Sequence, residues 1–298
     1  MPLLEAVPNV SEGRDAGRVR EIAAALASVP GVRLLDVSSD PDHHRSVLTA
    51  AGEPAPLEEG LTKLCRAALE RIDLRHHDGV HPRIGAIDVV PLVPLAGAAI
   101  ENAVESAERL GRRVGEELGV PVFLYGEAAR SADRRAPAAL RRLGLAALSE
   151  AIDGGALTPD YGPRRVDPRV GVTLIGARGF LVAFNVQLAT EDVRIARAVA
   201  KAIRERDGGL PGVQALGLAL ESRRRAQVSV NLLPTARASL FTVVERIRDE
   251  ASRHGVEIES SELVGLVPEE VALDAAADAL RLPRLSPAHL LERRLASS

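Results

Sequence analysis

The order of the expected helices and strands repeats along the chain, and this order limits the possible folds most. A strand at residues 3–7 precedes a helix with apolar residues at helical spacing, and two strands, a second amphipathic helix and a further strand follow up to residue 93. Residues 180–267 give the same order again. Strand, helix, strand, strand, helix, strand is the order of a ferredoxin-like domain. We therefore predict an α/β (α+β) chain with two βαββαβ subdomains.

The first subdomain is predicted to exceed the minimal motif. A helix over residues 100–118, stopped by Gly119, and a strand at 120–125 extend it, and residues 127–155 are expected to be partly helical. In that region the residues expected to face inward are Leu140, Leu143, Leu148 and Ile152. We place the two subdomains at residues 1–178 and 179–298, with two outer helices after residue 269.

The composition excludes several classes of protein. A net charge of -3, a pI near 6.2 and 2% aromatic residues argue against nucleic-acid binding. A single cysteine allows no intramolecular disulfide, and the N-terminus lacks the basic and apolar segments of a secretion signal. The longest apolar run, residues 86–100, contains Asp88 and two prolines and is too short to span a bilayer. We therefore expect a cytoplasmic protein without membrane or nucleic-acid partners.

Residues 75–88 combine titratable side chains with backbone breakers. Gly79 gives the backbone freedom, and Pro82 pushes the preceding residue towards extended geometry, so the segment is expected to be a tight loop that enters a strand. The loop presents His81, with Arg83 two residues later. A histidine with a fixed backbone and a nearby cation is suited to general acid/base catalysis on an anionic substrate.

Two other interpretations of this loop stay open. The first is an exposed polar loop without a chemical role. The second is a metal site that uses His77 and His81. The four-residue spacing of these histidines matches helical zinc pairs, but glycine and proline prevent a helix here, and Cys65 lies in an apolar helical pattern. We therefore expect no metal.

A second loop, at residues 158–171, is rich in glycine, proline and arginine. Connections of this length are either linkers or binding loops, and the prolines together with Tyr161 favour an ordered binding loop. Asparagines occur near the first strand of each half, Asn9 and Asn185.

Several motifs together make the chain resemble the formiminotransferase family, which comprises glutamate formimidoyltransferases and the corresponding part of formiminotransferase-cyclodeaminases. The motifs are Val7-Pro8-Asn9-Val10-Ser11-Glu12-Gly13, His81-Pro82-Arg83-Ile84-Gly85-Ala86, Leu124-Tyr125-Gly126-Glu127-Ala128-Ala129-Arg130, Gly176-Ala177-Arg178, Ala183-Phe184-Asn185 and Gln227-Val228-Ser229. The resemblance covers nearly the whole chain. It implies two α/β subdomains with a folate cleft between them.

The resemblance also implies roles for individual residues. The catalytic histidine of the family corresponds to His81. The folate-binding segment corresponds to Gly162, Pro163, Arg164, Arg165, Val166, Asp167, Pro168, Arg169, Val170 and Gly171. For the substrate carboxylates and the folate tail, arginines are the natural partners. The candidates for substrate binding are Asn9, Arg45, Arg83, Arg178 and Asn185.

The implied reaction moves a formimino group from N-formimino-L-glutamate to N5 of tetrahydrofolate, a co-substrate, and releases glutamate. Two alternatives remain, a folate-dependent formyl transfer from N-formylglutamate and a folate-binding protein without turnover. A homodimer is expected. Since only about thirty residues follow residue 267, we also expect a separate cyclodeaminase to act on the product.

Overall fold

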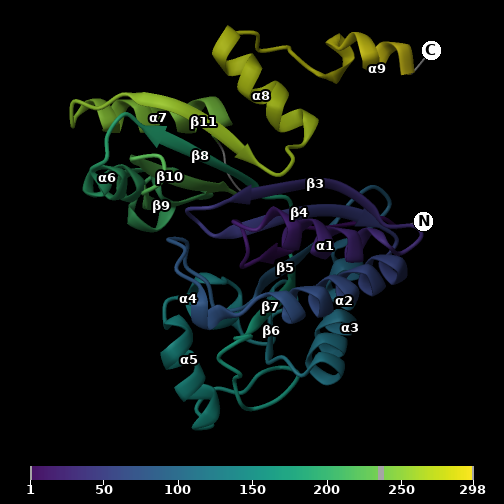
Figure 1. Ribbon diagram of the computed structural model, residues 1–298. Helices are drawn as coiled ribbons and strands as arrows, with labels where there is room; N and C mark the ends of the chain where they lie inside the picture. The colour runs from purple at the N-terminus through teal and green to yellow at the C-terminus, as the bar shows by residue number, and fades with distance from the viewer. Residues whose placement is uncertain (1, 234–237, 297–298) are drawn as a thin grey trace. The chain divides into compact units, whose positions relative to one another are not determined.

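The structure is a computed structural model that describes residues 2–233 and 238–296. The chain divides into two compact units, Met1–Gly179 and Phe180–Ser298. In Figure 1 the first unit runs from purple to teal and the second from green to yellow.

The first unit contains strands and helices in the order expected from the sequence, as far as the strand that follows the His81 loop. The strands are β1 (Leu4–Ala6), β2 (Asn9–Val10), β3 (Arg33–Asp40), β4 (Arg45–Gly52), β5 (Ile87–Pro94), β6 (Val122–Gly126) and β7 (Thr173–Ala177). The helices are α1 (Ala16–Ala27), α2 (Pro54–Arg71), α3 (Ile100–Leu118), α4 (Ala138–Arg141) and α5 (Gly144–Asp153). Short 3-10 helices occur at Leu74–His76 and Ala132–Arg134.

The sheet of the first unit begins as a ferredoxin-like sheet and continues beyond it. Strands β1 and β2 together form its first strand, because both pair antiparallel with β4 on one side and β5 on the other, while β3 pairs with β4. On the far side of β5, β7 pairs with β5 and with β6, and both pairings are parallel. Parallel strands need crossover connections. Helix α3 lies in the connection from β5 to β6, and α4 and α5 lie in the connection from β6 back to β7.

Apolar residues cover both faces of this part of the sheet. One cluster joins α1, α2 and α3 to the sheet and includes Leu26, Leu64 and Leu110, each fully buried. A second cluster lies against the other face, where Phe123 and Leu174 meet Leu148 of α5. Burial of both faces is typical of parallel strands. Apolar contacts on both sides therefore hold β5, the strand that follows the His81 loop, in place.

Three details of the first unit differ from, or refine, the sequence expectations. Helix α3 ends at Gly119 as predicted, with this glycine in the left-handed conformation (φ 69°). Of the four residues expected to face inward near α5, Leu143 was predicted wrongly, since it is 49% exposed. The helix is interrupted between Arg141 and Gly144, so Leu143 is out of phase with the buried positions. The expected long connection at residues 38–45 is a tight turn, because β3 and β4 extend into it.

The second unit contains the repeated motif. Its elements are β8 (Val182–Leu188), α6 (Val193–Ile203), β9 (Val213–Leu220), β10 (Arg225–Leu232), α7 (Leu240–Ser252), β11 (Ile258–Val264), α8 (Glu269–Leu280) and α9 (Leu291–Ala296), with short 3-10 helices at Glu205–Asp207 and Pro287–His289. The strand order is β11-β8-β10-β9, all antiparallel, which is the ferredoxin-like order. The predicted fold class of two ferredoxin-like subdomains, the first enlarged, is confirmed.

The core of the second unit lies between its sheet and α6 and α7, and it includes Phe184, Val199 and Ile247. Asp192 caps the N-terminus of α6 by accepting a hydrogen bond from the Arg194 N–H, as the sequence Thr190-Glu191-Asp192 predicts. Within residues 2–233 and 238–296, none of the helices is both long enough and apolar enough to cross a membrane.

Candidate active site

The loop that carries His81 lies between the 3-10 helix Leu74–His76 and β5, and it is tied to the turn between β3 and β4. The Val80 N–H donates to the Asp42 carbonyl over 3.0 Å. Gly79 approaches this turn so closely that a Cβ atom there would collide with the His43 carbonyl. The glycine that predicted a loop is therefore also required for its packing.

The imidazole of His81 is supported at Nδ1 by two groups. Arg45 Nη1 lies 2.8 Å from Nδ1, and the Pro82 carbonyl oxygen lies 2.8 Å from the same atom. A guanidinium only donates hydrogen bonds, whereas a carbonyl only accepts them. Thus Nδ1 accepts from Arg45 when Nε2 carries the ring proton, and donates to Pro82 when Nε2 has the free lone pair. The form that donates to Pro82 is the one whose Nε2 lone pair is free to take a proton.

Arg45 is fixed from several directions. Its Nε and Nη2 donate to Asn9 Oδ1 over 2.9 and 2.7 Å, and its Nη1 lies 3.1 Å from Asp88 Oδ2. The Asn9 amide in turn donates to the Val7 carbonyl over 2.7 Å. Burial lowers the pKa of Arg45 to about 10, although Asp88 opposes this effect, so the guanidinium is still charged at neutral pH.

Asp88 forms ion pairs with two arginines near His81, Arg45 and Arg141. Its side chain is 1% exposed, and its Oδ2 also lies 2.5 Å from Arg141 Nη2. Its Oδ1 accepts from the Ile84 N–H over 2.9 Å, which holds the end of the His81 loop against β5. One buried carboxylate therefore balances two guanidinium groups and fixes the backbone between His81 and the strand.

These surroundings lower the pKa of His81 well below 6.5. Burial is the main cause, and the positive charges of Arg45 and Arg141 and the nearby His43 ring act in the same direction. The His43 and His81 ring centroids are 5.6 Å apart. The reference pKa of a histidine side chain is about 6.5. His81 is therefore neutral near neutral pH.

A pocket of about 330 Å³ opens beside His81. Its lining residues are Leu74, Gly79, Val80, His81, Pro82, Arg83, Arg141, Gly144 and Leu145. The Arg141 Nε atom is buried and has no hydrogen-bond partner among the described residues. A buried donor without a partner is costly, so this atom is suited to bind an acceptor on a ligand.

Arg83 and Arg178, both predicted to bind substrate, are placed differently. The Arg83 guanidinium donates to loop carbonyls, over 2.7 Å to Gly79 and 2.5 Å to His77, and so holds the loop together. Arg178 lies beside the Tyr125 hydroxyl, whose pKa is raised by burial and lowered in part by Arg178 and Arg141. A substrate-binding role for either residue stays a prediction.

The loop at residues 162–171 packs along the first unit. Its second half is hydrogen-bonded to both ends of the His81 loop, because the Leu74 N–H donates to the Arg169 carbonyl over 2.9 Å and the Ala86 N–H to the Val170 carbonyl over 2.8 Å. Gly171 also pairs with Gly85. Arg164, Arg165 and Arg169 are exposed.

The first half of this loop borders a second, open pocket of about 630 Å³. Its lining residues are Gly115, Glu116, Gly119, Thr158, Pro159, Asp160, Tyr161, Gly162, Pro163 and Arg164. Within the loop, Val166 is buried and its N–H donates to Asp153 Oδ1 over 3.1 Å. The loop is thus anchored at its centre and its end, and its arginines are directed to solvent.

Asn185 lies in the second unit, on β8, where its Nδ2 donates to Glu262 Oε1 over 3.2 Å. The structure therefore brings Asn9, Arg45, His81 and Arg83 together in the first unit, and Asn185 belongs to the other unit. Among residues 2–233 and 238–296, no group of three or more His, Cys, Asp or Glu side chains is arranged to hold a metal ion.

Sequence reasoning missed Asp88, Arg141 and His43. A signal for Asp88 was present, since it is an acidic residue inside the apolar run of β5 and is 1% exposed. A charge at such a position needs a partner. Arg141, 53 positions later, gives no comparable signal because it lies on a helix among other arginines.

Comparison with known proteins identifies relatives of the whole chain. The profile of the formiminotransferase domain, N-terminal subdomain, matches residues 3–178, and that of the formiminotransferase domain matches residues 183–284. The chain is 44% identical over 297 residues to the glutamate formimidoyltransferase of Thermoplasma acidophilum. The aligned region covers 99% of this chain and 98% of the relative.

Two further relatives also match most of this chain. The glutamate formimidoyltransferase of Streptococcus pyogenes is 40% identical over 274 residues, or 92% of each chain. The formimidoyltransferase-cyclodeaminase of Sus scrofa is 44% identical over 280 residues, which are 92% of this chain and 52% of the relative. This chain thus matches about half of the longer relative.

Proposed function

The chain belongs to the formiminotransferase family, and we propose that it transfers the formimino group of N-formimino-L-glutamate to N5 of tetrahydrofolate. The products are 5-formiminotetrahydrofolate and L-glutamate. The observation that carries this proposal is the His81 imidazole, whose Nδ1 lies 2.8 Å from both Arg45 Nη1 and the Pro82 carbonyl oxygen and which lines a pocket together with Arg141.

Two proton movements must accompany the transfer. As the bond between N5 and the formimino carbon forms, N5 loses a proton, and as the bond from that carbon to the glutamate nitrogen breaks, this nitrogen gains one. His81 Nε2 has the lone pair for the first movement when Nδ1 donates to Pro82. The imidazolium that forms keeps its Nδ1 hydrogen and returns a proton from Nε2 to the glutamate nitrogen, which restores the neutral ring. A positioned acid/base of this kind contributes about 10²–10⁴ in rate.

The arginines near His81 suit an anionic donor. We propose that the buried Nε of Arg141 binds a carboxylate of formiminoglutamate, because this atom otherwise has no partner among the described residues. A bound carboxylate would offset the positive charges that lower the pKa of His81. The pKa of His81 would then rise, which favours proton uptake by the imidazole near neutral pH.

Tetrahydrofolate supplies the N5 nucleophile and carries an anionic glutamyl tail. The exposed arginines Arg164, Arg165 and Arg169 suit this tail, since arginine forms strong, charge-assisted hydrogen bonds with carboxylates. Their loop is bonded to both ends of the His81 loop, which supports a folate site next to the catalytic histidine.

Replacing Arg164, Arg165 and Arg169 together with Ala is expected to weaken folate binding more than donor binding. Because all three are exposed, each is worth about 0.2–1 kcal/mol, so together they change the folate Kd by about 3- to 100-fold. Calorimetric titration with folate measures the change. The matched control is replacement of the exposed Arg206 with Ala, which should leave the Kd unchanged; an unchanged Kd in the triple variant would assign the loop no role in folate binding.

The transferred group is tested by product analysis. The protein is mixed with tetrahydrofolate and either N-formiminoglutamate or N-formylglutamate, and the folate product is identified by mass spectrometry. We expect enzyme-dependent 5-formiminotetrahydrofolate from the first donor only. Formation of 5-formyltetrahydrofolate from the second donor at a similar rate would favour formyl transfer, and absence of turnover with both would favour a binding protein.

A further inference from the structure

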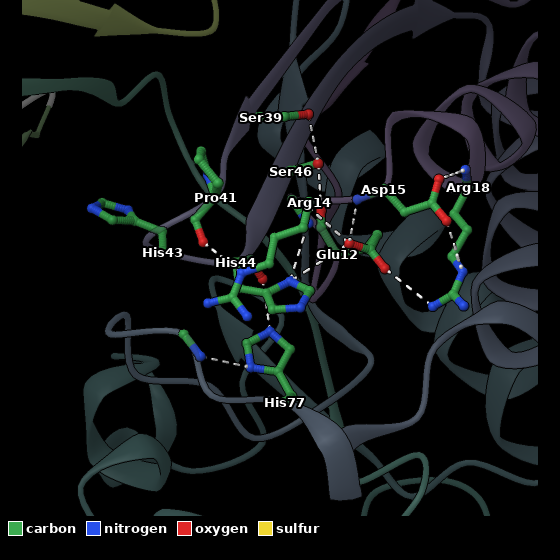
Figure 2. Close-up of polar contacts among 12 residues, drawn as sticks. Glu12, Arg14, Asp15, Arg18, Ser39, Pro41, His43, His44, Ser46 and His77 are labelled. Carbon is green, nitrogen blue, oxygen red and sulfur yellow. Dashed lines mark hydrogen bonds and ion pairs between the residues drawn. The ribbon is translucent and has the colours of Figure 1, made fainter. Parts of the chain in front are cut away.

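Two histidines outside the proposed chemistry lie between the His81 loop and the turn that leads to Arg45. His44 is at the end of the turn between β3 and β4, and His77 directly follows the 3-10 helix Leu74–His76. Their rings are stacked, with centroids 4.1 Å apart and an angle of 27° between the planes. Figure 2 shows both rings and the groups around them. We call His44 and His77 the histidine pair.

Backbone hydrogen bonds fix the protonation of both rings. The Gly13 N–H donates to His44 Nδ1, and the Gly79 N–H donates to His77 Nδ1, each over 3.2 Å. An amide N–H can only donate, so Nδ1 must have a free lone pair in both rings. His77 Nε2 lies 2.7 Å from the His44 carbonyl oxygen and therefore carries the proton that it donates there. Both rings are neutral in this arrangement.

The histidine pair joins the segment that holds His81 to the segment that holds its partner Arg45. Gly79, which donates to His77, is two residues before His81, and the carbonyl that accepts from His77 belongs to His44, the neighbour of Arg45. The 2.8 Å contact between Arg45 and His81 thus depends on the spacing that the stacked rings set.

We propose that His44 and His77 are positioning residues, which as a neutral stacked pair lock the His81 loop against the Arg45 turn, and that a proton on either ring releases this lock. The proposal rests on the proposed function only in assigning His81 to the chemistry. The lock itself is a property of the loop, and it can be measured without turnover.

A proton on either ring disrupts the contacts that the pair makes. The added hydrogen is on Nδ1 and points at the Gly13 or Gly79 N–H, so that hydrogen bond is lost. If both rings are protonated, two positive charges face each other at a centroid distance of 4.1 Å. A ring that turns away to avoid this repulsion also gives up the bond from His77 to the His44 carbonyl.

Charged groups of both signs surround the pair. Glu12 Oε1 lies 3.6 Å from His44 Nδ1 and favours a charged His44, as does Asp78, whereas Arg14 and Arg83 oppose it. Glu12 is already engaged by the Arg14 and Asp15 N–H groups, over 2.9 and 3.0 Å, and Asp78 by Arg14. The acidic groups are therefore largely occupied by other partners.

The net effect favours neutral rings. Burial lowers the pKa of His44, with Glu12 opposing this effect, and burial lowers the pKa of His77 to about 4, together with the charge of Arg83. In a released loop the pKa of each ring returns to about 6.5. The lock is therefore strongest above about pH 6.5, and below that it weakens by about tenfold per pH unit for each ring. This weakening ends near pH 4 for His77.

Substitutions without a titrating group separate the lock from simple packing. Gln at position 77 can still donate to the His44 carbonyl. Asn at position 44 can accept from Gly13, and it tolerates the positive φ of 49° found at His44. His77→Ala is expected to lower kcat at pH 8 by up to about 100-fold, the scale of a 1 Å misplacement. His77→Gln should restore most of this loss.

The pH dependence provides the decisive comparison. In the His44→Asn/His77→Gln protein the acid limb of kcat should lie at least about 0.5 pH unit lower than in the wild type, because only the wild-type lock is lost on acidification. The control is His76→Gln, which replaces an exposed histidine beside the pair and should leave the acid limb in place. An acid limb that is the same in the double variant and the wild type would overturn the proposal.

Hydrogen exchange tests the same lock without activity. Peptides that cover residues 74–83, corrected for the intrinsic pH dependence of exchange, should lose protection between pH 6.5 and 4.5 in the wild type but not in the double variant. Equal protection at both pH values in the wild type would overturn the lock even if the enzyme is active. Loss of protection in a protein that does not transfer formimino groups would leave the lock valid and refute the proposed function alone.

Discussion

Replacing His81 with Asn is expected to lower kcat by about 10²–10⁴-fold, the contribution of a positioned acid/base. Asn retains an oxygen that can accept the hydrogen bond from Arg45 Nη1, which in the wild type lies 2.8 Å from the ring. The surrounding charges and the pocket are then retained, and only proton transfer is removed. The measurement is steady-state turnover of formiminoglutamate and tetrahydrofolate at pH 7.5, together with calorimetric folate binding.

The control for this variant is His76→Asn, five residues earlier in the same loop region and exposed. It should keep the wild-type rate. Folding of the His81 variant is checked by its thermal midpoint, and its folate Kd should stay within about threefold of the wild-type value, less than 1 kcal/mol. If His81→Asn turns over at close to the wild-type rate, His81 has no part in proton transfer.

The position of His81 in a loop could be predicted because local sequence determines it. Gly79 and Pro82, three residues apart, disfavour a helix in this segment, and the absence of a side chain at Gly79 allows close packing against His43. The loop at residues 158–171 was predicted for the same reason, from its glycines and prolines. Both features depend on backbone conformations that only a few residue types favour.

The partners of His81 could not be predicted in the same way. Asp88 meets Arg45 and Arg141, which are 43 and 53 positions away, and only the order of the strands and the placing of helix α4 bring them together. Apolar periodicity shows which face of a strand is buried, but it does not show which strands are neighbours. For this reason the insertion of β7 between β5 and β6 was also not predicted.

Arg83 illustrates a different limit. Its place two residues after His81 suggested a substrate ligand, yet its guanidinium donates to the Gly79 and His77 carbonyls of its own loop. Arginine side chains are long enough to fold back on a tight loop, and buried carbonyls need donors. A sequence identifies such a cation as local to the site without indicating whether it binds the ligand or the loop.

Replacing Asp88 with Asn is expected to lower the free energy of unfolding of the first unit by about 3–5 kcal/mol, the cost of removing one partner from a buried ion pair. The Asp88 side chain is 1% exposed, and those of Arg45 and Arg141 are 14% and 18% exposed. Asn still offers an oxygen to the Ile84 N–H, so the loss measures the charge rather than the backbone contact. Urea unfolding followed by tyrosine fluorescence reports on this unit, because both tyrosines, Tyr125 and Tyr161, lie in it and the chain has no tryptophan.

The matched control is Glu59→Gln, which removes the charge from an exposed ion pair in the same unit. Glu59 Oε2 lies 2.7 Å from Arg113 Nη2, and the two side chains are 43% and 32% exposed. Exposed pairs contribute about 0–1 kcal/mol, so this variant should unfold close to the wild-type urea concentration. A similar small effect for Asp88→Asn would contradict the view that the carboxylate is needed to hold two guanidinium groups in the site.

A double variant distinguishes this electrostatic cause from a packing defect. If Asp88→Asn is destabilising because it leaves two buried guanidinium groups facing each other, then adding Arg141→Gln removes one of the unbalanced charges. The double variant should then be more stable than the sum of the two single effects predicts, by about 0.5–3 kcal/mol. Additive losses would instead mean that Asp88 acts through the local packing of β5. In the electrostatic case, the charge of Asp88 is what allows two arginines to remain beside a neutral His81.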